Sequence, residues 1–171
     1  MEWKAFELRP GTPPEGIPKP FQPGESNELR ANLKKAAEDA GLVNMRRQPI
    51  TPCGRPSLEA AEYAKDMGKF DAYHKATFKG FWEEGKNIGD PEVLKGIFEE
   101  CDLDWNGFIS SERNGQYAQR VEDQLAEARM YGITRIPAFI LDSYLVVGTQ
   151  PYQLFQAVIE RIQKDKALNR L

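Results

Sequence analysis

The sequence predicts a single α/β domain, and three of its features lead to that class. The 171 residues are 40% hydrophobic and 11% aromatic, which is enough apolar surface for one substantial core. Apolar residues at helical spacing dominate the middle of the chain. Short apolar runs of the kind that form strands lie near both ends. The expected order is strand, several helices, hairpin and a closing helix.

The start of the chain predicts a strand followed by a long loop. In MEWKAFEL, apolar Trp3 and Ala5 alternate with charged Glu2 and Lys4, which is typical of a half-buried strand. The next segment, RPGTPPEGIPKPFQPGES, holds six of the twelve prolines. We expect this segment to run over the surface without regular structure.

Helical spacing then predicts a series of helices. Asp90-Pro91-Glu92 is a strong helix start, and Gly132 is suited to the left-handed conformation that ends a helix. The aromatic residues from Phe70 to Phe81 predict one apolar face that belongs to the core. The predicted helices cover about 29–40, 56–67, 70–81, 91–101 and 117–131.

A change of period after Gly132 predicts a hairpin. The runs PAFIL and YLVV are separated by Asp142-Ser143, a two-residue polar turn. Gly148 to Pro151 then precede a closing helical pattern. The hairpin opens with Pro137, which cannot donate an N–H to a sheet, so this position needs a separate explanation.

Charge and hydropathy exclude two classes of partner. The net charge is −3, and the 23 Lys and Arg are scattered among 26 Asp and Glu, which argues against a nucleic-acid partner. The sequence has no apolar run of the roughly 18 residues that a membrane span needs. It also shows no signal-peptide pattern at its start, so we expect no membrane partner and a cytoplasmic location.

The two cysteines do not form a recognisable motif. Cys53 and Cys101 lie 48 positions apart, so they make neither a CxxC pair nor a zinc-ligand pair. We expect two reduced thiols. Cys53 lies just before a predicted helix, a position where thiols can be nucleophilic, and this leaves its reactivity open.

No metal, cofactor or catalytic residue is predicted from the remaining motifs. The segment DLDWNGFISSE resembles a calcium loop, but Arg113 stands where that loop needs its closing carboxylate. We expect a capped turn between two helices there. His74 is the only histidine, and its place among aromatic residues favours an interior or helix-face role.

Several segments together resemble a known family. GITRIPAFIL followed by YLVVGTQPYQLFQAVIERI resembles the C-terminal part of the DsbA-like branch of the thioredoxin superfamily, in particular its FrnE-like proteins. The resemblance covers almost the whole chain. It implies one thioredoxin-like domain, 1–171, with the thioredoxin part at 1–28 and 112–171 and a large helical insertion at 29–111. Further matching segments, in the same order, are MEWKAFELRPGTPPEG, SLEAAEYAKDMGKFDAYHKATFKGFWEEGKNIGDPEVL and QYAQRVEDQLAEARMYGI.

The resemblance also explains Pro137. In this family the strand after the long helix begins with a cis-proline, and the Ile136-Pro137 bond occupies that place. The loop lies against the redox cysteines, and the backbone of the residue before the proline can pair with an extended substrate segment. The resemblance therefore implies substrate-binding roles for Ile136 and Pro137.

One part of the family pattern is absent from this sequence. The family's domain starts with a strand and a helix that carries a CxxC, or a serine in the related isomerases, whereas this sequence begins at the expected second strand. That first strand lies in the middle of the sheet, so its absence leaves unpaired edges. We expect either a longer protein or partner chains, such as further copies, that complete the sheet.

The implied function is that of a DsbA-family thiol–disulfide oxidoreductase-like protein, without a cofactor and with a protein thiol or disulfide as partner. We expect this chain to be redox-inactive, because it contains no CxxC. Two alternatives stay open. One is a relative of the 2-hydroxychromene-2-carboxylate isomerases and kappa-class glutathione transferases, with a glutathione-like substrate. The other is a noncatalytic binding or assembly module.

Overall fold

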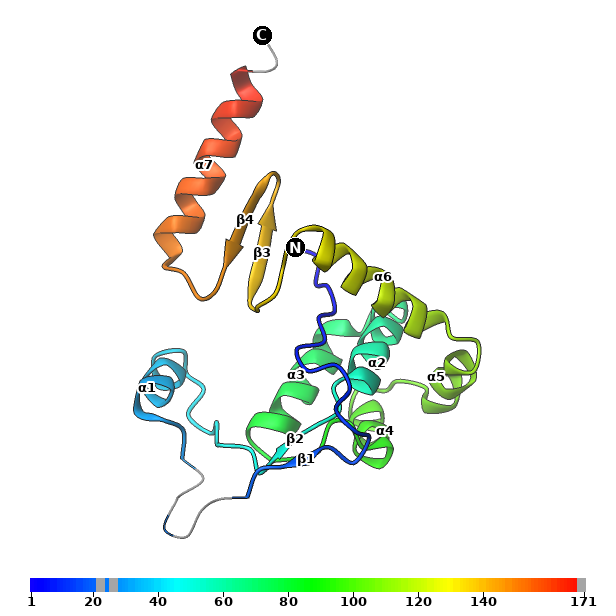
Figure 1. Cartoon of the computed structure of the whole chain (residues 1–171). Helices are drawn as coiled ribbons and strands as arrows, with labels where there is room; N and C mark the ends of the chain where they lie inside the picture. Colours follow the sequence, from blue (N-terminus) through cyan, green and yellow to red (C-terminus); the bar gives the residue numbers. More distant parts are fainter. Residues whose placement is uncertain (21–23, 25–27, 169–171) are drawn as a thin grey trace. The chain divides into compact units, whose positions relative to one another are not determined.

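The computed structural model describes residues 1–20, 24 and 28–168. This part of the chain is mixed α/β, with seven helices and two short sheets (Figure 1). It divides into two compact units, Met1–Leu125 and Ala126–Leu171, which are described separately below. In chain order the elements are β1 (Ile17–Pro18), α1 (Ala31–Asp39), β2 (Ile50–Thr51), α2 (Arg55–Asp66), α3 (Phe70–Trp82), α4 (Pro91–Glu100), α5 (Trp105–Glu112), α6 (Gln116–Met130), β3 (Ala138–Leu141), β4 (Tyr144–Val147) and α7 (Tyr152–Leu168).

The predicted helix starts are confirmed by their local bonds. The Asp90 side chain accepts a hydrogen bond of 2.8 Å from the Glu92 N–H, and Pro91 is the first residue of α4. At α2, the Ser57 hydroxyl donates to the Gly54 carbonyl at 2.8 Å. The Asp90 bond satisfies one of the N–H groups that the first turn of a helix leaves unpaired.

The core of the first unit is built from aromatic side chains of consecutive helices. The Tyr63 ring of α2 lies 5.8 Å from Phe98 of α4, 5.6 Å from Phe108 of α5 and 5.6 Å from Tyr117 of α6, between ring centroids. Phe98 is fully buried. Edge and offset contacts of this kind add to the stabilisation that burial of the rings provides.

The predicted single aromatic face of α3 is wrong. Tyr73 is 1% exposed and faces the core, whereas Phe78 is 53% exposed. Residues spaced by four share one side of a helix, so Phe70, His74 and Phe78 form a second row away from Tyr73. His74 lies in this row, with its ring centroid 5.3 Å from Phe70 and 4.5 Å from Phe78.

The predicted strand at Met1 to Leu8 is also wrong, because this segment has no regular secondary structure. Neither sheet of the described residues includes it. Instead, the Ala5 N–H donates to the side-chain carbonyl of Gln124, and Lys65 Nζ donates to the Trp3 carbonyl at 2.6 Å. A segment becomes a strand only beside another strand, and here side chains take the backbone bonds that a neighbouring strand would make.

The proline-rich loop contains one element that the sequence did not predict. Ile17 of β1 pairs with Thr51 of β2 in an antiparallel bridge. Gly16 precedes it with φ +78°, and a Cβ there would lie 2.8 Å from the Thr51 carbonyl oxygen, so only glycine fits. The loop residues 21–23 and 25–27 lie outside the described residues.

The second unit contains the predicted hairpin and closing helix, and both are confirmed. β3 pairs antiparallel with β4, with Phe139 opposite Val146, and Asp142 at the turn has φ 57°. The Phe139 ring packs edge-on against Phe155 of α7 at 5.0 Å. The other side of the hairpin presents apolar side chains to solvent, including Ile140 and Leu145, each 42% exposed. The division into a thioredoxin part and a helical insertion stays a prediction.

Within the described ranges, no helix is long and apolar enough to cross a membrane.

The aromatic core gives a first test. We expect Phe98→Ala to lower the free energy of unfolding by about 3–5 kcal/mol, because it leaves a cavity among four aromatic rings. Phe78→Ala is the matched control and should cost less than about 1 kcal/mol, since Phe78 is 53% exposed. Urea unfolding measures both variants, and equal losses would contradict the assignment of the core.

Candidate functional site

The end of α6 positions the loop that precedes β3. Gly132 has φ +67°, its N–H donates to the Arg129 carbonyl at 3.0 Å, and the Ile133 N–H donates to the Ala128 carbonyl at 2.9 Å. This pair of bonds is a Schellman cap, which confirms Gly132 as the end of the helix. The cap fixes the point from which Thr134 to Pro137 lead into the hairpin.

The Ile136-Pro137 peptide bond is cis. Pro137 stands immediately before β3, and its carbonyl accepts a 2.7 Å hydrogen bond from the Gly148 N–H. A residue at the head of a strand can contribute its carbonyl without an N–H, which answers the question that Pro137 raised.

Ile136, the other residue that the resemblance implied, is 47% exposed. In the described part of the chain, no hydrogen bond reaches its backbone N–H or C=O. Both groups are therefore free for an extended segment that lies beside the loop. Such pairing of a peptide with an open edge is a common mode of peptide recognition.

Cys53 lies in the turn before α2 and is half-buried as a free thiol. Its backbone is tightly packed, because a Cβ on the buried Gly89 would lie 2.6 Å from the Cys53 carbonyl oxygen. The predicted position before a helix is confirmed, since α2 begins at Arg55. Its reactivity stays a prediction.

Cys101 is a free thiol at the end of α4 and is 8% exposed. Burial raises the pKa of its thiol, the Glu100 carboxylate raises it further, and Lys69 opposes the change. It contributes to the lining of a depression of about 790 Å³ together with Trp3 and Phe70. Because the thiolate is the nucleophile, a thiol with a raised pKa is poorly suited to attack a disulfide.

His74 has no partner that would make it a general base. Its ring is half-buried, with the Trp3 ring at 4.9 Å in addition to the two α3 rings, and it makes no hydrogen bond to the described residues. Burial lowers the pKa of this imidazole, and Asp71 partly opposes the change. His74 therefore fits the predicted helix-face role.

The segment that resembled a calcium loop forms a helix over most of its length. Residues Trp105–Glu112 are α5, and the turn before it contains Asp102 and Asp104. The expectation of a turn between helices holds only for this short stretch, and Asp104 makes no side-chain cap. No group of three or more His, Cys, Asp or Glu in the described residues is arranged to hold a metal ion.

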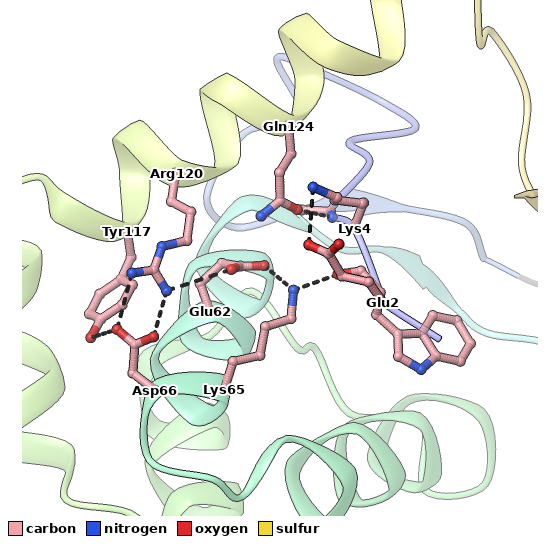
Figure 2. A network of polar contacts seen from close by, with 10 residues as sticks. Glu2, Lys4, Glu62, Lys65, Asp66, Tyr117, Arg120 and Gln124 are labelled. Atoms are coloured by element: carbon pink, nitrogen blue, oxygen red, sulfur yellow. Dashed lines mark hydrogen bonds and ion pairs between the residues drawn. The ribbon is translucent and has the colours of Figure 1, made fainter. Parts of the chain in front are cut away.

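The sequence analysis missed a network of charged side chains between α2 and α6 (Figure 2). Arg120 donates two hydrogen bonds to the Asp66 carboxylate, at 2.7 and 3.1 Å, and the Tyr117 hydroxyl donates to it at 3.1 Å. The Glu62 carboxylate is nearly buried and lies 2.5 Å from Lys65 Nζ and 3.9 Å from Arg120 Nη1. The partners supply the positive charge that a buried carboxylate requires.

A second arginine makes the reciprocal connection. Arg55 at the start of α2 lies 2.6 Å from the Glu122 carboxylate of α6 and donates to the Ala118 carbonyl at 2.9 Å. It also bonds Glu59 within α2 at 2.5 Å. In the sequence, only the spacing of four residues between Arg55 and Glu59 could have indicated an ion pair. The contacts of Arg55 with α6 join residues more than 60 positions apart, and no local pattern predicts them.

Comparisons with known proteins show the family of this chain. A family model described as a DSBA-like thioredoxin domain matches residues 1–160. The uncharacterized protein YwbO of Bacillus subtilis is 29% identical over 168 residues, which cover 97% of this chain and 84% of YwbO. The crystal structure of a probable DsbA oxidoreductase from Streptomyces coelicolor is similar with a TM-score of 0.68 and 25% identity. That match covers 76% of this chain but only 57% of the solved chain, so this chain spans little more than half its length.

The Arg120 network predicts a pH dependence. Hydrogen bonds from Arg120 lower the pKa of Asp66, and Tyr117 adds to this against the opposing effect of burial. The folded-state pKa is below the unfolded value, so the stabilisation is present above about pH 4 and is lost as the pH falls through the folded-state pKa. We expect Asp66→Asn to cost about 1 kcal/mol or less at pH 7.

The measurement is urea unfolding of both proteins from pH 7 to pH 2.5. The stability difference between them should shrink as the pH falls below about 4. A difference that stays constant over this range would show that the Asp66 charge is not involved. Lys35→Gln, which removes an exposed pair with Asp39 on α1, serves as a control for general charge effects.

Proposed function

Because the chain belongs to the family of DSBA-like thioredoxin domains, we propose that it is a DsbA-family thiol–disulfide oxidoreductase-like protein that holds an extended thiol-containing protein segment at Ile136 and Pro137. The single observation that carries this proposal is the exposed Ile136 backbone. Its N–H and C=O make no hydrogen bond to the described residues. An extended segment would gain main-chain hydrogen bonds there.

The neighbouring contacts support a fixed geometry for this loop. The Gly132 cap holds its beginning, and the bond from the Gly148 N–H to the Pro137 carbonyl holds its end. A site that is held in place loses less conformational entropy on binding than a mobile loop does. The two residues between the cap and Ile136, Thr134 and Arg135, are exposed and remain accessible to a substrate.

We propose that the attacking thiol is neither of the two cysteines of this chain. In thiol–disulfide exchange a thiolate attacks one sulfur of a disulfide, forms a mixed disulfide and releases the other sulfur as a thiolate; a second thiol then resolves the intermediate. Cys53 and Cys101 are 48 positions apart in sequence and do not form a CxxC. We therefore propose that this chain is redox-inactive alone and contributes the substrate-holding half of the reaction.

Two sources could supply the missing half: a further segment of a longer protein, or a partner chain, including a second copy, that completes the sheet. The solved relative is longer than the match to it, which agrees with the first source. Static light scattering tests the second source, and a strict monomer would count against it. The cytoplasmic location stays a prediction.

The missing dithiol gives a direct prediction. We expect the chain to leave the rate of insulin-disulfide reduction by dithiothreitol at the buffer value, because a lone thiol cannot complete the two-step exchange. The assay measures the turbidity of precipitating insulin chains, with thioredoxin as a positive control. Turnover that Cys53→Ala abolishes would overturn the proposal that the thiol comes from elsewhere.

Peptide binding tests the proposed site itself. An extended peptide with one cysteine, added to the ¹⁵N-labelled protein, should shift the amide signals of residues 133–136 and 138 more than those of the α2 and α3 helices. The pairing of the peptide with the Ile136 backbone is the physical reason. Reduced glutathione is the matched small thiol: shifts caused by glutathione and not by the peptide would favour the isomerase and transferase alternative. No shift with either would contradict the proposed site.

A further inference from the structure

We infer that Arg135 determines which segments the Ile136 loop accepts, and that it favours extended segments with carboxylates close to the thiol-bearing residue. This inference rests on the proposed function and names its substrate class. It concerns a side chain to which neither the resemblance nor the comparisons assign a role.

Arg135 is exposed and has no hydrogen bond or ion pair with the described residues. It is the only charged residue in GITRIPAFIL. Three arginines of the chain are already engaged: Arg55, Arg120 and Arg161 each bond a carboxylate. Arg135 therefore has its guanidinium available for a carboxylate from another molecule, which it can bind through two parallel hydrogen bonds.

The charge composition of the second unit favours the same ligand. Residues 126–171 contain six Lys and Arg against four Asp and Glu, although the whole chain has a net charge of −3. The ion pairs of Asp142 with Lys166, at 3.1 Å, and of Asp165 with Arg161, at 3.1 Å, each join one acid to one base and leave this excess of positive charge unchanged. A positive surface attracts acidic segments and repels basic ones.

The end of α6 does not cancel this attraction. The last carbonyls of a helix carry a partial negative charge, which would disfavour an acidic ligand nearby. Here the Ala128 and Arg129 carbonyls accept hydrogen bonds from the N–H groups of Ile133 and Gly132. The last turn also contains the cation of Arg129. Arg135 is therefore the first unpaired charge that follows the helix.

The position of Arg135 next to Ile136 determines which residues of a bound segment it can contact. A substrate residue paired with the Ile136 backbone has its own neighbours about 3–7 Å away along an extended chain. Arg135 directly precedes Ile136, so a carboxylate one or two residues from the paired position falls within reach of its long side chain. For an exposed pair we expect each such carboxylate to strengthen binding about two- to fivefold.

Three matched peptides of about eight residues test the inference. They share one cysteine and differ only in the two flanking residues on each side, which are Glu, Gln or Lys. Titrations followed by the amide signals of residues 133–136 and 138 give the dissociation constants for the parent protein, Arg135→Gln and Lys164→Gln. Lys164→Gln removes one exposed positive charge from α7, in the same unit, and is the control for net charge.

The parent should bind the Glu peptide more tightly than the Gln peptide, and the Lys peptide most weakly. Arg135→Gln should remove the advantage of the Glu peptide, whereas Lys164→Gln should retain it. The advantage should also shrink as salt is raised from about 0.05 to 0.5 M, because exposed charges are screened.

Equal binding of the Glu and Gln peptides by the parent, or a Glu preference that survives in Arg135→Gln, would overturn the inference and leave the proposed function intact. Failure of all three peptides to shift the loop amides would overturn the proposed function, and with it the inference. Matching urea midpoints for the three proteins verify that the exposed substitutions leave the fold unchanged.

Discussion

The reciprocal arginine contacts between α2 and α6 are the constraint on which the rest of the first unit depends. Arg55 reaches from α2 to α6, and Arg120 reaches from α6 to α2. Arg120 also lies beside Glu62, which Lys65 contacts from its own helix. Glu62 is 2% exposed and would destabilise the fold by about 3–5 kcal/mol if it were left without a partner. Because the two helices are joined by directional bonds as well as by ring packing, their register along one another is defined.

The same pair of helices also holds the start of the chain. Gln124 of α6 and Lys65 of α2 each bond one backbone group between Trp3 and Ala5. Two side chains thus do part of what a sheet partner does elsewhere, and they do so from one side of the segment.

Local patterns predicted the parts of the fold that local physics decides. Asp90 with Pro91 marked the start of α4, and Gly132 marked the end of α6, because caps act within a few residues. The bridge between Ile17 and Thr51 was missed, since two-residue strands give no periodic signal and the partner lies far along the chain. The arginine contacts were missed for the same reason. The loop at Pro137 was found through resemblance, because a proline alone does not specify what lies opposite it.

The exposed apolar side of the β3–β4 hairpin affects how the protein behaves at high concentration. Its outward side carries Ile140 and Leu145, and a two-stranded sheet has an open edge on each side. Apolar side chains beside free backbone groups favour association between identical molecules, which ends in precipitation when nothing limits it. The solubility of the protein therefore reports whether this side of the hairpin is covered. A segment or partner that packs on it will raise the concentration at which the protein precipitates.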